Sequence, residues 1–280
     1  MIPLEEFTDV ATAACRRAGF FLAENFGRVT AEMIRRKKHM DYVTEMDLTA
    51  ERMIIDTITA SFPTHKIMAE ETRRDTGEGY RWIIDPLDGT TNYIHGFPRY
   101  AVSIALEKDG ELMVGTVYDP ERDELFAAEK GRGATLNGRP IRVSEITDPT
   151  LALVGTGIPF RNIEFLDSYL DSLREITLGV SGVRRPGAAA LDLADVACGR
   201  TDGFWEICLC PWDVAAGSLL ITEGGGKCSS INGQSNGVES GHVAAGNPSV
   251  YAFIQPIVDK TLTPALARRS PDLPKSKFCR

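Results

Sequence analysis

A short acidic turn carries the side chains best suited to chemistry. An apolar run leads into Asp85, and Asp88 follows three residues later. Pro86 cannot donate a hydrogen bond to a neighbouring strand, so we expect the strand to stop there and both aspartates to share one tight turn. The amides of Gly89 and Thr90 could bind an anion at the start of a helical turn. Taken alone, these residues also fit an ordinary Asx-rich turn.

Three further acidic side chains have the same ambiguity. Glu70 ends a predicted strand, where it could simply be solvated. Asp213 opens a helix after Pro211, where it could merely complement the helix dipole. Asp47 follows Thr44 by three residues, which is the spacing of a capping box.

If these carboxylates lie in one pocket, they could bind a metal cation together. Several carboxylates cannot lie together without compensation, because like charges raise one another's pKa. Hard cations with oxygen ligands supply that compensation. A haloacid-dehalogenase mechanism would place its nucleophilic Asp two positions before a second Asp, and here Pro86 stands at that position.

Four motifs, in order and at characteristic separations, resemble the inositol monophosphatase family. They are residues 41–47 (DYVTEMD), 69–71 (AEE), 82–93 (WIIDPLDGTTNY) and 211–217 (PWDVAAG). Residues 187–194 and 202–207 are most similar to the family's bacterial branch, the SuhB type. The resemblance extends over about residues 5–258.

The resemblance implies a Mg²⁺-dependent phosphomonoesterase with a layered α-β-α-β-α sandwich, a mixed α+β and α/β fold. By this resemblance, Glu70, Asp85 and the carbonyl of Leu87 hold one Mg²⁺. A second Mg²⁺ is expected at Asp85, Asp88 and Asp213. The first ion would lower the pKa of a water molecule, and the second would stabilise the leaving alkoxide.

The resemblance also assigns catalytic and substrate-binding positions. Asp47 and Thr90 would orient and activate the attacking water, with Glu70 as a third catalytic residue. The substrate contacts implied are Asp88, Gly89, Thr90, Ala189, Glu206 and Asp213. A carboxylate at Glu206 could accept hydrogen bonds from adjacent hydroxyls of a cyclitol.

The expected activity is hydrolysis of myo-inositol monophosphate to inositol and phosphate, with inhibition by lithium. Fructose 1,6-bisphosphate, adenosine 3′,5′-bisphosphate and NADP are alternative substrates. A second class of function is also open. Members of the SuhB type are linked to the transcription machinery of ribosomal RNA operons, so the chain could be a regulatory protein that binds it.

The elements that position these residues follow from hydrophobic periodicity. Apolar spacing predicts helices over residues 3–27, 44–62, 162–175, 187–198 and 212–223. Strands are predicted at residues 29–34, 66–69, 81–84, 100–106, 112–118, 124–128, 133–136, 151–155, 202–207 and 242–245.

The order of these elements predicts two halves. The succession of strands and hairpin turns over residues 100–136 predicts an antiparallel sheet in a first domain, residues 1–146. Alternating helices and strands predict an α/β domain over residues 147–267. Residues 268–280 are expected to form a loose polar tail.

Composition limits the other possibilities. The 280 residues carry a formal net charge of −8, which argues against nucleic-acid binding through the overall charge of the protein. No apolar run is long enough to cross a bilayer, and the acidic start of the chain does not resemble a secretory signal. We therefore expect a cytoplasmic protein without a membrane partner, and the family resemblance suggests a homodimer.

Overall fold

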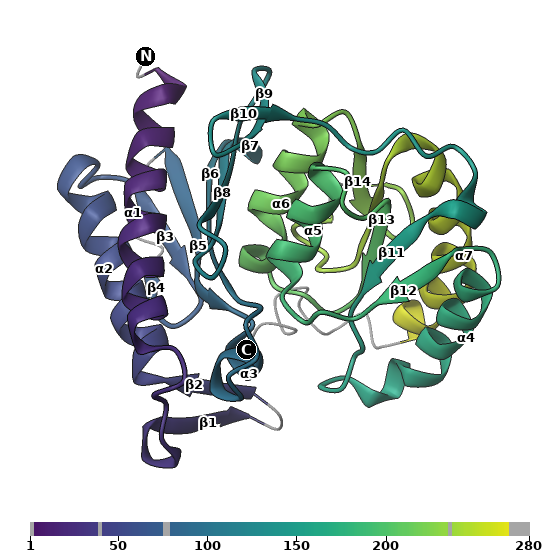
Figure 1. Ribbon diagram of the computed structural model, residues 1–280, viewed down its shortest axis with the longest axis horizontal. Coiled ribbons are helices and arrows are strands. Elements are labelled where there is room, and N and C mark those ends of the chain that lie inside the picture. The colour runs from purple at the N-terminus through teal and green to yellow at the C-terminus, as the bar shows by residue number, and fades with distance from the viewer. Residues whose placement is uncertain (1–2, 39–40, 75–78, 235–236, 269–280) are drawn as a thin grey trace.

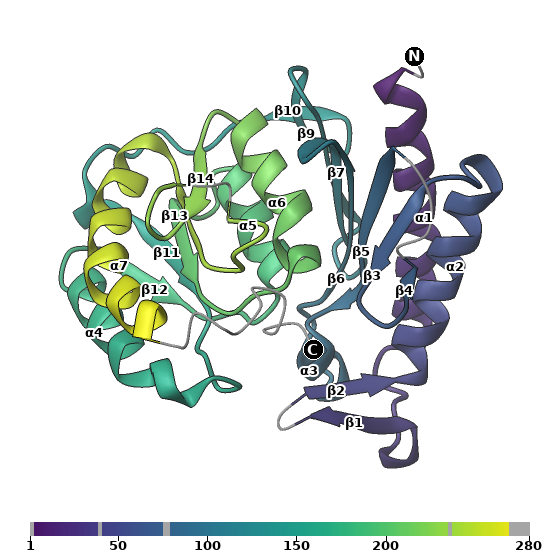
Figure 2. The ribbon, with the colours of Figure 1, turned by 180° about the vertical axis from the view of Figure 1, so that it is seen from behind.

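Helices and two large sheets alternate in layers. The computed structural model describes residues 3–38, 41–74, 79–234 and 237–268; the predicted tail therefore lies almost entirely outside the described residues. From one side to the other, the layers are helices, sheet, helices, sheet, helices (Figures 1 and 2). This is the α-β-α-β-α sandwich that the sequence predicts.

An eight-stranded sheet forms the first half. In order across the sheet, its strands are β10 (Arg139–Ile141), β9 (Gly133–Leu136), β8 (Glu124–Glu129), β7 (Glu111–Asp119), β6 (Ala101–Lys108), β5 (Tyr80–Asp88), β3 (Lys66–Ala69) and β4 (Arg73–Arg74). Neighbouring strands are antiparallel except β3 and β5. Helices α1 (Leu4–Asn25) and α2 (Glu45–Ser61) cover its outer face, where Phe7, Leu22 and Ile58 are fully buried.

A five-stranded sheet forms the second half. Its order is β12 (Gly182–Arg184), β11 (Leu153–Thr156), β13 (Gly203–Glu206), β15 (Val243–Gly246) and β14 (Lys227–Ser230). The first three strands are parallel and the last two pairs are antiparallel. Helices α4 (Leu166–Thr177) and α7 (Pro248–Arg268) pack on its outer side around Trp205 and Ile254.

Helices α5 (Ala189–Ala197) and α6 (Pro211–Glu223) fill the layer between the sheets. Helix α6 is apolar on nearly all sides, as a helix between two sheets must be. Gly115 of β7 allows the close approach of α6, because a Cβ there would lie 2.9 Å from the carbonyl oxygen of Ala216. The ends of β5 and the starts of α5 and α6 meet in this layer.

Two of the predictions about local structure are wrong. The strand expected at residues 29–34 is instead a loop and a 3-10 helix (Ala31–Met33), followed by β1 (Ile34–Lys38), which pairs with β2 (Asp41–Thr44). Pro86 does not stop β5. The strand continues to Asp88 because the register against β6 shifts between Asp85 and Asp88, so Pro86 occupies an irregular position that requires no ladder donor.

Several elements were not predicted from sequence. The longest is α7, which contains Pro256 and Pro264, residues that normally argue against a helix interior. The others are β1, β2, β4, β10, β12, β14 and the 3-10 turn at Pro149–Leu151. The helical turn expected at Gly89 and Thr90 is the short helix α3 (Thr90–Ile94), and the helix predicted over residues 162–175 begins with a 3-10 turn at Ile163–Phe165. Within the described residues, no helix combines the length and apolar character needed to span a bilayer.

Candidate active site

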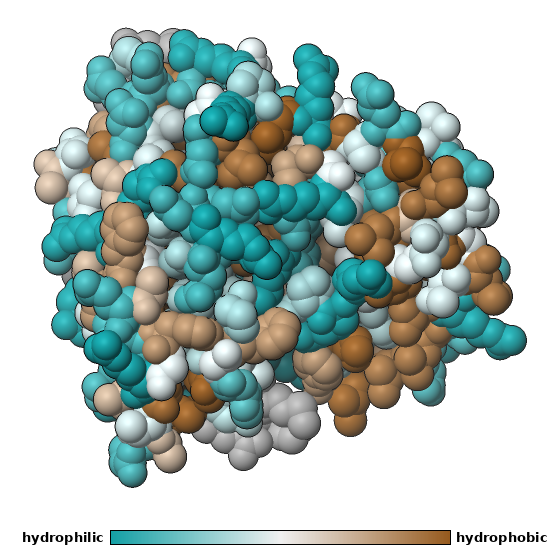
Figure 3. All heavy atoms as spheres, viewed as in Figure 1, coloured by the Kyte–Doolittle hydropathy of each residue, from teal (hydrophilic) through white to brown (hydrophobic). Residues whose placement is uncertain are grey.

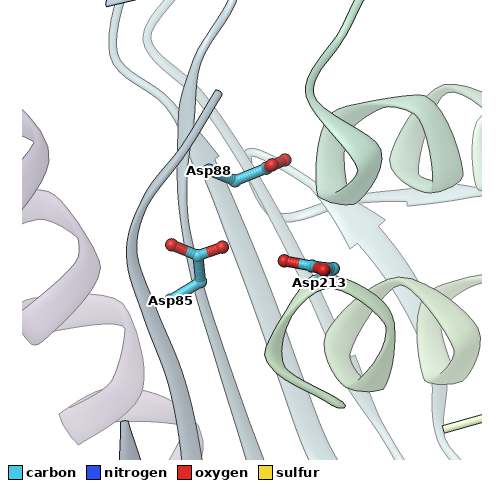
Figure 4. Close-up of side chains that lie close together, drawn as sticks. All are labelled: Asp85, Asp88 and Asp213. Atoms are coloured by element: carbon cyan, nitrogen blue, oxygen red, sulfur yellow. The ribbon is translucent and has the colours of Figure 1, made fainter. Parts of the chain in front are cut away.

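Three carboxylates converge where β5 meets α6; Asp85 and Asp88 are buried and Asp213 is half-buried. Asp85 and Asp88 come from the end of β5, and Asp213 comes from the first turn of α6 (Figure 4). One oxygen of each lies within 4.8 Å of the others, and Asp85 is only 2% exposed. The structure therefore brings together, from both halves of the chain, the three carboxylates that were expected to hold a second metal ion.

Backbone amides fix the orientation of each carboxylate. Asp85 Oδ1 accepts a hydrogen bond from the Leu87 amide at 3.0 Å. Asp88 Oδ2 accepts one from the Ala190 amide at 2.8 Å, in the first turn of α5. Asp213 Oδ2 accepts one from the Cys210 amide at 2.7 Å, as part of a capping box. Asp213 can therefore cap α6 and belong to the acidic cluster at the same time.

The electrostatics of the cluster favour a bound cation. Burial raises the pKa of Asp85 and of Asp88 well above the usual value, and neighbouring carboxylates raise both further. Burial likewise raises the pKa of Asp213 to about 6. A divalent cation among these oxygens would relieve this repulsion, and an all-oxygen donor set is the type that hard cations prefer.

Glu70 lies beside the cluster. Its amide donates to the Ile84 carbonyl at 3.1 Å, so it follows β3 directly along the edge of β5. Its carboxylate is close enough to raise the pKa of both Asp85 and Asp213. The turn after Glu70 is held by Glu51, a buried residue of α2 that sequence analysis missed; Oε2 of Glu51 accepts from the amide of Glu71 at 2.7 Å.

Thr90 and Asp47 are in contact. Thr90 Oγ1 lies 3.1 Å from Asp47 Oδ1 and 3.1 Å from the Leu87 carbonyl oxygen, and its single proton can be donated to one of them at a time. Asp47 Oδ2 accepts from the amide of Thr44 at 2.8 Å and from its hydroxyl at 2.6 Å. Asp47 therefore caps α2 with one oxygen and contacts Thr90 with the other.

Gly89 is required at the turn between the strand and α3. Its φ of 88° lies in the left-handed region, and a Cβ there would lie 2.9 Å from the Arg99 carbonyl oxygen and 3.3 Å from the Ala188 Cβ. The α3 helix begins at the next residue, Thr90. Gly89 and Thr90 both line the pocket, and the binding of an anion by their amides stays a prediction.

A pocket of about 240 Å³ joins these residues to the predicted substrate contacts. Ala189 and Glu206 both line it, together with the metal-site candidates Glu70, Asp85, Leu87, Asp88 and Asp213. Burial raises the pKa of the Glu206 carboxyl well above its usual value. Gly157 leaves the space that Glu206 occupies, since a Cβ there would lie 1.9 Å from the carboxylate.

The pocket also contains residues that sequence analysis did not select. Phe160, Arg161 and Arg185 line it on the side of the second half. Arg185 stands two residues before Gly187, the start of a motif that was noticed, but nothing in the spacing showed that it would turn toward the acidic cluster.

Comparison with known proteins agrees with this geometry. The model of the inositol monophosphatase family matches residues 3–269. A Pseudomonas aeruginosa protein named Nus factor SuhB is 45% identical, over 95% of this chain and all of that protein. The SuhB structure from Bartonella henselae is 39% identical with a TM-score of 0.88, and covers 92% of this chain and 100% of that one.

A second solved structure extends the comparison to a named enzyme. An inositol monophosphatase from Anabaena is 38% identical with a TM-score of 0.82, covering 93% of this chain and 99% of that one. The match over nearly the whole length, the shared layered fold and the acidic cluster support a phosphatase activity. The chain belongs to the inositol monophosphatase family.

Proposed function

We propose that this chain is a Mg²⁺-dependent phosphomonoesterase that hydrolyses myo-inositol monophosphate. The observation that carries the proposal is the cluster of Asp85, Asp88 and Asp213, whose close carboxylates, two of them buried, favour a hard cation. The Anabaena relative is named inositol monophosphatase, which supports the choice of substrate. Fructose 1,6-bisphosphate, adenosine 3′,5′-bisphosphate and NADP are the rival substrates.

The proposed metal ligands fall into two sets that share Asp85. Glu70, Asp85 and the Leu87 carbonyl would hold one Mg²⁺, and Asp85, Asp88 and Asp213 would hold another. When bound, these ions lower the pKa of the attacking water and neutralise charge on the phosphate and the leaving oxygen. Amide hydrogen bonds to Asp85, Asp88 and Asp213 keep their carboxylates oriented in advance.

Residues of the first half would handle the water and the phosphate. Thr90 lines the pocket, and its hydroxyl would donate a hydrogen bond to Asp47 Oδ1 and accept one from the attacking water. Glu70 borders the same space. The amides of Gly89 and Thr90 stand at the start of α3 and would donate to the phosphate oxygens.

Residues of the second half would bind the alcohol. Glu206, at the end of β13, would accept hydrogen bonds from two adjacent ring hydroxyls. Ala189 would contact the ring, and the Asp213 carboxylate would contact the hydroxyl beside the metal ligands. A polyol suits this set of groups better than a flat base.

Phosphate release tests the proposal. The purified chain should release phosphate from myo-inositol 1-phosphate in Mg²⁺ and not in EDTA. It should act more slowly on fructose 1,6-bisphosphate, adenosine 3′,5′-bisphosphate and NADP. Millimolar lithium should inhibit the reaction. Full activity in EDTA, or no release from any of the four esters, would refute it.

A second function is favoured by the names of the relatives. The Pseudomonas aeruginosa protein is named a Nus factor, so we propose that this chain also binds the transcription machinery, as a homodimer. Pull-down of RNA polymerase with the wild type and with Asp88→Asn tests this. Equal capture by both would separate the interaction from catalysis, and failure of both would remove the proposal.

A further inference from the structure

The turn that carries Glu70 lies at the edge of the eight-stranded sheet. Residues 70–72 connect β3 to β4, and β4 is the last strand at this edge and contains only two residues. The amide of Glu70 donates to the carbonyl of Ile84 at 3.1 Å, which fixes the start of the turn against β5. The side chain of Glu70 is half-buried and lines the pocket. Its direction therefore depends on what holds the rest of the turn.

A buried carboxylate of α2 holds the rest of the turn. Glu51 is only 2% exposed. Its Oε2 accepts a hydrogen bond from the amide of Glu71 at 2.7 Å, and its Oε1 accepts one from the hydroxyl of Thr72 at 2.5 Å. Hydrogen bonds to a carboxylate are stronger than those between neutral groups. The two oxygens of Glu51 thus hold the two residues that directly follow Glu70.

The same helix also holds Asp47. Asp47 and Glu51 are four residues apart, and side chains at this spacing lie on one face of a helix, one above the other. Asp47 is fully buried, and its Oδ1 lies 3.1 Å from Thr90 Oγ1. Helix α2 packs against β5, the strand that carries Asp85 and Asp88. One face of α2 therefore contacts both the residue expected to orient the water and the turn expected to supply a metal ligand.

We propose that Glu51 is a positioning residue that holds Glu70 at the acidic cluster and thereby sets the affinity for the Mg²⁺ that Glu70 would bind. The inference rests on the proposed function and adds a supporting residue to it. Glu51 is not among the described residues that line the pocket, so its effect must pass through the turn that it holds. Removing a group that orients a metal ligand typically lowers metal affinity by about 10–100-fold.

A direct effect of the Glu51 charge on the metal is the alternative. Burial raises the pKa of the Glu51 carboxyl, the hydrogen bonds from Thr72 and Glu71 lower it, and the charge of Glu70 raises it. The carboxylates of Glu51 and Glu70 are therefore close enough to repel each other. Glu51→Gln separates position from charge, because glutamine is neutral but can still accept from the Glu71 amide and donate to the Thr72 hydroxyl.

Calorimetric titration of the metal-free chain with Mg²⁺, in the absence of substrate, tests the inference. Glu70→Gln identifies the Mg²⁺ site that depends on Glu70. Glu51→Ala should weaken the same site about ten-fold or more, and Glu51→Gln by less than about three-fold. In the Glu70→Gln background, Glu51→Ala should weaken Mg²⁺ binding no further, because a positioning residue acts only through the group that it positions.

Two further variants complete the test. Thr72→Val removes one of the two hydrogen bonds at an exposed side chain, so it should fold even if Glu51→Ala does not, and should weaken the Glu70 site by about two- to five-fold. Ile58→Ala is the matched control, since Ile58 is fully buried about two turns further along α2. It should lower the Tm in EDTA and leave Mg²⁺ affinity within about two-fold.

The inference is overturned by any of four results. Unchanged Mg²⁺ affinity in Glu51→Ala and Thr72→Val would show that the turn needs no support. Equal weakening by Glu51→Gln and Glu51→Ala would assign the effect to charge. Additive effects of Glu51→Ala and Glu70→Gln, or an equal loss of affinity in Ile58→Ala, would show that Glu51 only stabilises the fold. The expected changes in Mg²⁺ affinity without phosphate release from any ester would refute the phosphatase function alone.

Discussion

Asp47→Asn should separate catalysis from helix capping. In the native protein, one carboxylate oxygen caps α2 by accepting from the amide and hydroxyl of Thr44, and the other contacts Thr90. Asparagine can keep the capping oxygen, but it then presents an NH₂ group to Thr90. That group donates to Thr90 Oγ1, whose proton must turn to the Leu87 carbonyl, 3.1 Å away. Thr90 then has fewer lone pairs to offer the attacking water.

The expected magnitudes follow from these contacts. Loss of correct water orientation and of the nearby negative charge should lower kcat by about 10²–10⁴-fold, with a much smaller change in KM. The two capping bonds survive as neutral hydrogen bonds in place of charge-assisted ones, so the free energy of unfolding should fall by only about 1–2 kcal/mol. Asp47 is fully buried, so solvent cannot substitute for either contact.

Thr44→Ala is the matched control. It removes one capping hydroxyl and leaves the contact between Asp47 and Thr90 intact. We expect it to cost about 1 kcal/mol of stability with little change in kcat. Thermal unfolding and steady-state kinetics of both variants distinguish a catalytic role of Asp47 from helix capping alone. If Asp47→Asn loses stability like Thr44→Ala and retains its kcat, Asp47 is only a helix cap and the catalytic assignment is wrong.

Three further predictions concern the acidic cluster and the alcohol site. Asp88→Asn should abolish most Mg²⁺-dependent activity, because one charge of the cage is lost; an active variant with an unchanged Mg²⁺ requirement would contradict the assignment. Burial raises the pKa of Asp213 to about 6, so the folded metal-free protein binds a proton more tightly than the unfolded chain. The stability that this proton contributes is present below about pH 4 and is lost as the pH rises through about 6. In EDTA, the Tm should therefore fall from pH 4 to 7, and the increase in Tm caused by Mg²⁺ should be larger at pH 7. An increase in Tm that does not depend on pH would argue against this coupling. Glu206→Gln should raise KM for myo-inositol 1-phosphate about ten-fold while sparing a small ester without hydroxyls, and equal losses on both esters would place Glu206 in the fold or the metal site instead.

Hydrophobic periodicity predicted the antiparallel sheet of the first half and the α/β arrangement of the second, whereas the layered sandwich was expected from the family resemblance. Helix α2 and strand β3 lie within a residue of their predicted bounds, since caps, Pro63 and apolar spacing mark their ends. Helix α7 was missed because its two prolines argue against a helix in the sequence, whereas packing against β15 stabilises the helix in the folded protein. The continuation of β5 past Pro86 depends on a register shift against β6, and only the paired strand reveals it.

Part of the candidate site could be predicted from sequence, because some of its residues stand in distinctive local motifs. The carboxylates Asp85, Asp88 and Asp213 stand in distinctive local motifs, and the structure brings them together. Their supporting groups are ordinary residues in sequence. The Ala190 amide that holds Asp88 is 102 positions away, and no local pattern marks it. Arg185 likewise becomes a pocket residue only through the loop that Asn92 holds in place.

The position of the acidic cluster between β5 and α6 has a consequence for how the protein unfolds. Asp85 and Asp88 belong to one sheet, whereas Asp213 belongs to a helix packed between the two sheets. An ion held by all three therefore binds only while these layers stay docked. Ligand that binds the docked state alone adds about 2.7 kcal/mol of stability at one hundred times its Kd. Magnesium availability would thus govern how often the layers separate, and with it the lifetime of the protein in the presence of proteases.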